Sequence, residues 1–162
     1  MPHLRLEVPE EWLRENFIKT TGFDARKLLD HLVGVVAGLH MDQPAIDELG
    51  KEGQAKRNAP HRPEQVPMIN KHNLKHALIP VHHSGIGGDS SKGFLHLTFA
   101  ASNQKPGRTA SVRRRAAETL GNAIDRFVGD LPSLESVTIH VVDIDRDRGY
   151  STTAERKRRR EE

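Results

Sequence analysis

Pro2 offers the most specific chemistry in this sequence of 162 residues. If Met1 is removed, Pro2 becomes a free secondary amine, which can take a proton from one atom of a substrate and return it to another. The pKa of an α-amino group is ordinarily about 7.7 to 8.0, and an apolar environment lowers it because burial disfavours the ammonium form. Pro2 could therefore act as a general base at neutral pH. A proline at the second position can equally be a permissive start of the chain, and this residue alone leaves both interpretations open.

The residues that follow predict a β-strand that would position this amine. Leu4, Leu6 and Val8 alternate with polar residues, which is the period of a half-buried strand. Pro2 shares their parity, so we expect its ring to point to the apolar side.

Two helices and three more strands are predicted after this first strand. Leu28, Leu32 and Val36 recur at helical spacing behind Asp24, a residue type that caps helix starts. The predicted elements are a helix over 24–39, a strand over 74–82, a strand over 94–99, a helix over 110–128 and a strand over 137–144. Their order is β-α-β followed by β-α-β. We expect residues 10–21 to form a polar connection, and residues 40–72 to form a polar insertion.

The composition excludes several kinds of chemistry and location. The sequence has no cysteine, so disulfides, thiolate nucleophiles and cysteine-ligated metals are excluded. Ten histidines are present, but His72, His76, His82 and His83 have no carboxylate at a recognisable ligand spacing, and we predict no metal site. No apolar stretch approaches the length of a membrane span, and no signal peptide is apparent, so we expect a cytoplasmic protein with no membrane partner.

The net charge of +3 is concentrated at the C-terminal end. Residues 146–162 hold seven cations and four anions, which leaves the remainder neutral overall. Such a basic tail can bind RNA or an acidic partner, or it can be a solvated end. Tyr150 is the only aromatic residue there, so the stacking residues typical of nucleic-acid binding are largely missing and we do not expect a nucleic-acid partner.

Taken together, these motifs resemble the 5-carboxymethyl-2-hydroxymuconate isomerases of the tautomerase superfamily. The resemblance rests on the opening Met-Pro-His, the strand 94–99 and the Gly107-Arg108 pair before a helix, which occur in the family's order. It implies an α+β fold in which two β-α-β units form a four-stranded mixed sheet with both helices on one face. We expect one such domain over residues 1–145, and both its polar insertion at about 40–72 and the basic tail over residues 146–162 exceed the usual short chain of the family.

The resemblance implies roles for three residues. Pro2 matches the amino-terminal base, which moves a proton within an unsaturated 2-hydroxy or 2-oxo carboxylic acid without any metal or organic cofactor. Arg108 matches an arginine that would hold a substrate carboxylate through a bidentate fork, although it could also be a solvent-exposed residue at a helix start. A gapless alignment backward from Phe94 places Leu74 at the family's second arginine, with Lys71, Lys75 and His76 nearby. Lys75 is the candidate second cation, with the geometry of a point charge.

Family members are usually trimers, and we expect a homotrimer here that survives deletion of the residues after Asp147. Covering only one face of the sheet with helices would leave the other face open. We expect that open face to carry the apolar residues of the third and fourth strands, which are Leu95, Leu97, Phe99, Val137, Ile139 and Val141. The alternative function is a noncatalytic trimeric protein that binds a partner or nucleic acid through the insertion and the tail.

Overall fold

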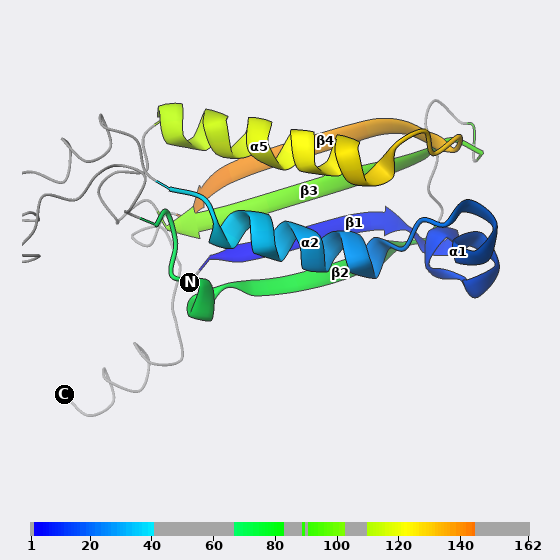
Figure 1. The fold of residues 1–162 in the computed structure, drawn as a ribbon, viewed down its shortest axis with the longest axis horizontal. Helices are drawn as coiled ribbons and strands as arrows, with labels where there is room; N and C mark the ends of the chain where they lie inside the picture. Colours follow the sequence, from blue (N-terminus) through cyan, green and yellow to red (C-terminus); the bar gives the residue numbers. More distant parts are fainter. Residues whose placement is uncertain (1, 41–66, 83–88, 90, 103–109, 145–162) are drawn as a thin grey trace, which may run out of the picture.

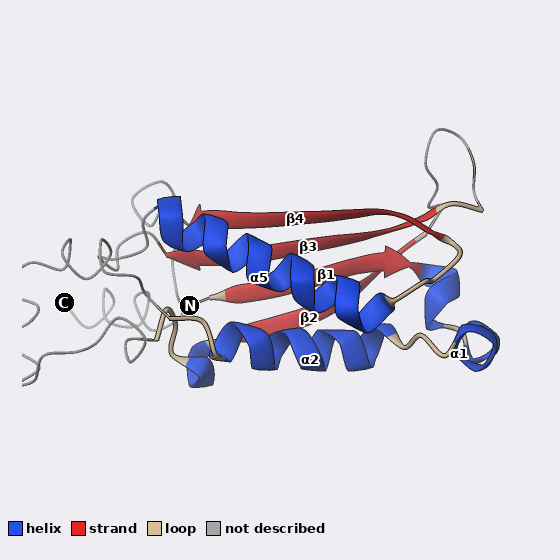
Figure 2. Cartoon of the chain, turned by 45° about the horizontal axis from the view of Figure 1, so that its top comes forward, coloured by secondary structure: helices blue, strands red, loops and turns tan. Residues whose placement is uncertain are grey.

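The computed structural model describes residues 2–40, 67–82, 89, 91–102 and 110–144. They form a four-stranded mixed sheet with the strand order β2-β1-β3-β4, and the helices α2 and α5 cover one face (Figures 1 and 2). Strand β1 pairs in parallel with β2 and antiparallel with β3, and β3 pairs in parallel with β4. The predicted α+β fold, with two β-α-β units in one sheet, is confirmed. The elements are β1 (His3–Pro9), η1 (Glu10–Leu13), α1 (Glu15–Thr21), α2 (Ala25–Ala37), η3 (Lys71–Asn73), β2 (Lys75–Val81), β3 (Gly93–Ser102), α5 (Ala110–Val128) and β4 (Leu134–Ile144).

The two long helices form where the sequence pattern predicts them. The Asp24 side chain accepts a hydrogen bond of 2.9 Å from the backbone N–H of Arg26, and this bond caps the start of α2. Helix α5 occupies the predicted range and buries one apolar stripe, made of Val112, Ala116, Leu120, Ala123 and Ile124. The buried apolar residues of α2 and of α5 pack against the same face of the sheet.

The apolar residues of β3 and β4 lie on the covered face of the sheet, so the expectation that they form the open face is wrong. Leu95, Leu97 and Phe99 are fully buried. Val137, Ile139 and Val141 are partly buried and pack against the same core. The two helices already cover this apolar surface, and the alternating residues give the open face a mixture of polar and apolar side chains, from Arg5, His96 and Thr98 to Ile79 and the exposed Val142.

The polar connection predicted over residues 10–21 is also wrong, because this segment forms η1 and α1. Trp12 is buried, stacks on Phe17 with ring centroids 5.4 Å apart, and meets the edge of Phe23 at 5.6 Å. The three aromatic rings provide enough apolar surface to pack the segment against the end of the sheet. Gly93, at the start of β3, leaves the space that the Trp12 ring occupies.

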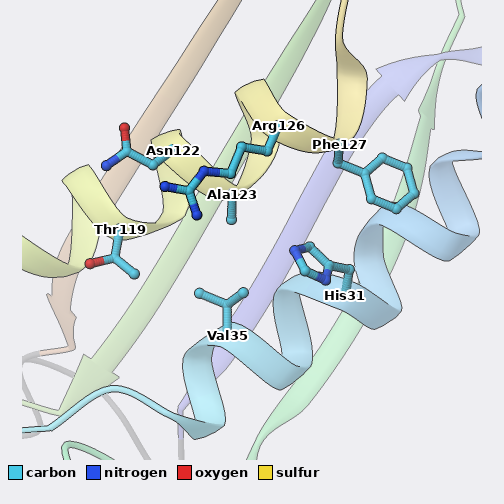
Figure 3. Close-up of a pocket in the computed structure, with 7 residues that line it drawn as sticks. All are labelled: His31, Val35, Thr119, Asn122, Ala123, Arg126 and Phe127. Carbon is cyan, nitrogen blue, oxygen red and sulfur yellow. The ribbon is translucent and has the colours of Figure 1, made fainter.

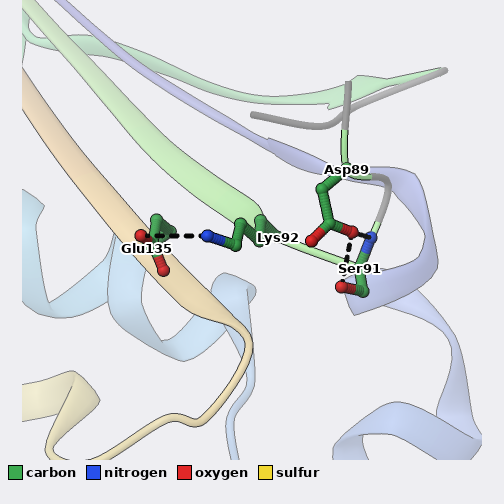
Figure 4. Close-up of polar contacts among 4 residues, drawn as sticks. All are labelled: Asp89, Ser91, Lys92 and Glu135. Carbon is green, nitrogen blue, oxygen red and sulfur yellow. Dashed lines mark hydrogen bonds and ion pairs between the residues drawn. The ribbon is translucent and has the colours of Figure 1, made fainter. Parts of the chain in front are cut away.

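Polar side-chain contacts connect the residues just before β3 to one another and to β4 (Figure 4). The Lys92 ammonium lies 3.4 Å from a Glu135 carboxylate oxygen and links β3 to β4. The Asp89 carboxylate accepts hydrogen bonds from the Ser91 hydroxyl at 2.6 Å and the Ser91 backbone N–H at 2.9 Å. These hydrogen bonds, from the side chain first and then from the backbone, lower the pKa of Asp89.

Most of the predicted insertion (41–66) and the whole basic tail (146–162) lie outside the described residues. Within the described part of the chain, no helix has the length and apolar character needed to cross a membrane.

Candidate active site

Pro2 lies buried immediately before β1, at the edge of the apolar core. The next three residues of its parity, Leu4, Leu6 and Val8, are fully buried beneath the helices. The Pro2 carbonyl accepts a hydrogen bond of 3.0 Å from the backbone N–H of Lys75, which ties the start of β1 to the start of β2. The backbone around Pro2 is therefore held in a fixed position by its neighbouring strand.

Lys75 is close to Pro2 through its backbone, but its side chain belongs to the other face. Lys75 is the register partner of His3, and neighbouring residues in a sheet row share a face. Leu4 is buried beneath the helices, so its neighbour His3 points to the open face, and the exposed Lys75 side chain begins on that open face too. His76 is the register partner of Leu4 and therefore lies on the side of the helices. Of Lys75 and His76, the first two residues of β2, the exposed His76 is the one that shares the face of Leu4.

Arg108 lies outside the described residues. Helix α5 begins at Ala110, as the sequence pattern predicts, so Arg108 precedes the helix by two positions. Its proposed contact with a substrate stays a prediction.

His3 is a titratable group at the amino end of β1, next to Pro2 in the sequence. It is half-buried on the open face. Burial, followed by the positive charges of the chain's amino terminus, Lys75 and Arg5, lowers the pKa of His3 below its ordinary value of 6.5. The neutral imidazole is therefore the favoured form at neutral pH. This end of the sheet combines a buried proline, a neutral histidine and an exposed ammonium group.

The described residues contain no cluster of three or more histidine, aspartate or glutamate side chains that could hold a metal ion. His82 instead contacts Glu10, with 2.5 Å between Nδ1 and Oε2, in an exposed pair at the opposite end of β1 and β2. His96 and His140 form a separate pair on the open face, with ring centroids 4.8 Å apart in an edge-to-face arrangement. Sequence periodicity placed His96 on the polar face of its strand, but only the register of β3 and β4 brings His140 beside it.

A groove of about 460 Å³ lies between α2 and α5 on the outer side of the helical layer (Figure 3). His31 of α2 stacks on Phe127 of α5 at 5.8 Å, and the polar groups of Asn122 and Arg126 lie at its rim. The groove contains neither Pro2 nor Lys75. It is a feature of helix packing separate from the amino end of β1.

The known proteins that this chain resembles have a similar fold but little similarity in sequence. No protein-family model matches the sequence, and no curated protein matches it at a significant level. A solved structure of a 5-carboxymethyl-2-hydroxymuconate delta-isomerase is similar at 17% identity and a TM-score of 0.60, with 94% of this chain and 87% of that chain covered. A 5-carboxymethyl-2-hydroxymuconate isomerase from Deinococcus radiodurans R1 is similar at 15% identity and a TM-score of 0.53, over 98% of this chain and 93% of that chain.

A further similar structure is described as a symmetric trimer of a fused 4-OT. It shares 10% identity and a TM-score of 0.50, and 93% of each chain is covered. At these identities the similarity establishes architecture. The chain has the fold of the 5-carboxymethyl-2-hydroxymuconate isomerases and of other tautomerase-superfamily proteins, as the sequence motifs predicted.

Proposed function

We propose that this chain is a cofactor-independent tautomerase, an isomerase that moves a proton within an unsaturated 2-hydroxy or 2-oxo carboxylic acid. One observation carries the proposal: Pro2 is buried at the amino end of β1, beside the apolar core. The similarity in fold to solved isomerases supports the same role.

The proposed chemistry uses the Pro2 nitrogen twice. Once Met1 is removed, the neutral amine takes the hydroxyl proton of a dienol acid, and the oxygen becomes a carbonyl as electrons shift along the conjugated chain. The Pro2 ammonium then returns a proton to the distal carbon, so the amine is regenerated and no other reactant is consumed. The apolar surroundings of Pro2 favour the neutral amine, and the Lys75 to Pro2 backbone hydrogen bond of 3.0 Å limits movement of the ring.

Two cations are proposed to bind the substrate. Arg108 would hold the carboxylate through a bidentate fork before α5, where the helix amides also favour an anion. Lys75 is the proposed second cation and would act as a point charge, reaching the substrate from the start of the edge strand β2, where its backbone lies beside Pro2.

We also propose that the chain assembles as a homotrimer. The symmetric trimer among the similar structures supports this state. Because Leu95, Leu97 and Phe99 of β3 and their neighbours on β4 are covered by the helices, the proposed contact surface is the open face with its alternating residues, in place of the surface expected from the sequence.

Replacing Pro2 tests the chemical proposal. Pro2→Ala leaves a primary amine of different basicity and geometry, and we expect turnover of a dienol acid, followed by ultraviolet absorbance in the presence of a chelator, to fall by about 100-fold or more. Pro80→Ala is the matched control, since Pro80 is exposed on the edge strand β2. Circular dichroism checks that both variants fold. Equal activity of the Pro2→Ala variant and the control would contradict the proposal.

A further inference from the structure

The groove between α2 and α5 has no part in the proposed chemistry. Its volume is about 460 Å³, within the range of about 300 to 1,000 Å³ that is typical of small-molecule sites. Helix α2 forms one side of the groove and helix α5 the other (Figure 3). Neither Pro2 nor Lys75 lines it. A ligand in this groove would therefore contact the helices and leave the candidate active site free.

The inner surface of the groove is apolar and aromatic. It is formed by Val35 of α2 and by Ala123 and Phe127 of α5, all of which are buried or half-buried. His31 of α2 stacks on Phe127, with ring centroids 5.8 Å apart and ring planes at 29°. Phe23 of the core packs nearly perpendicular to Phe127 at 6.4 Å and limits the movement of that ring. This surface suits a flat ring, because aromatic side chains stack favourably on one another.

The rim of the groove carries the positive charge of Arg126. This side chain is exposed and extends back along α5 toward Asn122 (Figure 3). In the part of the chain that the structure describes, no carboxylate lies within ion-pair distance of the Arg126 guanidinium. The Asn122 amide and the Thr119 hydroxyl lie about one and two helical turns before Arg126, and both can donate hydrogen bonds. None of the described residues that line the groove is acidic, so an anion bound there meets attraction without repulsion.

We propose that this groove binds a small aromatic carboxylate. The ring lies on the apolar surface beside Phe127, and the carboxylate accepts two hydrogen bonds from the Arg126 guanidinium. The charge of the rim determines the sign of the ligand's charge, and the volume suits a ligand of one or two rings. Because the polar residues of the rim are exposed to solvent, the expected dissociation constant is about 0.1 to 1 mM. The site does not rest on the proposed role of Pro2.

Titration of the isotope-labelled full-length protein with 2-naphthoate, followed by nuclear magnetic resonance, tests the proposal. We expect the backbone amide signals of His31, Asn122 and Arg126 to shift and to saturate with this dissociation constant. The uncharged 2-naphthamide should bind about tenfold more weakly, because it has the same rings without the charge. Acetate has the charge without the rings, and it should cause no saturable shift over the same concentrations.

Two substitutions separate the charge from the aromatic surface. Arg126→Gln should raise the dissociation constant of 2-naphthoate about tenfold and leave that of 2-naphthamide unchanged. The matched control is Arg114→Gln, since Arg114 is an exposed arginine of the same helix that does not line the groove. Phe127→Leu keeps an apolar side chain without the ring, and it should weaken binding of both probes about fivefold. Circular dichroism checks that each variant folds, and Arg126→Gln still provides the test if Phe127→Leu does not.

The positions of the shifted signals distinguish the groove from the candidate active site. The Pro2→Ala variant should bind 2-naphthoate as the natural sequence does, because Pro2 does not line the groove. Shifts confined to His3 and Lys75, or loss of binding in the Pro2→Ala variant, would overturn the proposal, whereas turnover of a dienol acid reports on the proposed base separately. Equal affinity for the two naphthalene probes, or an Arg126→Gln variant that binds like Arg114→Gln, would overturn it as well. So would the absence of a saturable shift up to about 10 mM 2-naphthoate.

Discussion

Replacing Gly93 by alanine should destabilise the protein through a single contact. An ideal Cβ on Gly93 would lie 2.2 Å from Cζ2, 2.8 Å from Cε2 and 3.0 Å from Cη2 of Trp12. Carbon atoms in contact are ordinarily about 3.5 to 4.0 Å apart, so the ring or the strand would have to move by about 1.3 Å. Trp12 is only 2% exposed and is stacked on Phe17, which leaves its rigid ring little room to move.

The expected loss in the free energy of unfolding is therefore about 3 kcal/mol, the upper end of the range for overpacked cores. Urea denaturation followed by circular dichroism measures it, and the fluorescence of Trp12, the only tryptophan in the sequence, reports the same region. Gly34→Ala is the control. Gly34 is on α2 with no atom within 4 Å of an added Cβ, so this change should stabilise the protein by about 0.5 to 1 kcal/mol.

A double substitution isolates the clash from other effects of alanine. Trp12→Leu removes the offending ring and is costly by itself, at about 3 kcal/mol or more. In that background, Gly93→Ala should cost less than about 1 kcal/mol, and the difference is the coupling energy of the contact. A Gly93→Ala variant as stable as the natural sequence, or one equally destabilised with and without Trp12, would refute the packing argument.

Three further predictions concern the helix cap, the pH dependence of stability and substrate binding. Asp24→Ala should lower the free energy of unfolding by about 1 kcal/mol through loss of the cap on α2, and thermal denaturation measures this loss. Because the pKa of His3 is lowered in the folded state, the stability that His3 contributes is complete above about pH 6.5 and is lost as the pH falls through the folded-state pKa. His3→Gln should therefore flatten the slope of the unfolding free energy against pH below about pH 6.5. An unchanged slope would contradict the lowered pKa of His3. Arg108→Ala should lower kcat/KM for carboxylated substrates by about 10- to 100-fold, whereas Arg114→Ala, an exposed change within α5, should not.

The alternation of Leu4, Leu6 and Val8 and the helical stripe of α5 predicted their elements well, because both segments bury one continuous apolar face. The helix cap at Asp24 was predictable for the same local reason. Residues 10–21 were not predictable in this way. Their order comes from the packing of Trp12 on Phe17 and Phe23 and from the space left by Gly93, a residue far away in the sequence.

In the candidate site too, local sequence patterns predicted some features, and the pairing of strands determines the others. The parity of Pro2 follows from the strand pattern, and the parallel pairing of β1 with β2 determines that Lys75 lies beside it. Strand order and register also decide that the apolar residues of β3 and β4 lie under the helices and that His140 lies against His96. These features depend on which strands are neighbours, and periodicity within one strand carries no information about that pairing.

The central claim, that the free amine of Pro2 is the base, is tested most directly by measuring intact mass and dienol ketonisation on the same preparation of the full chain. The account predicts that the active protein has lost Met1, and that the fraction of chains beginning at Pro2 equals the fraction of active sites found by titration with a tight-binding enol analogue. Full activity in a preparation that retains Met1 would contradict it, because the Pro2 nitrogen would then be an amide with no proton to exchange.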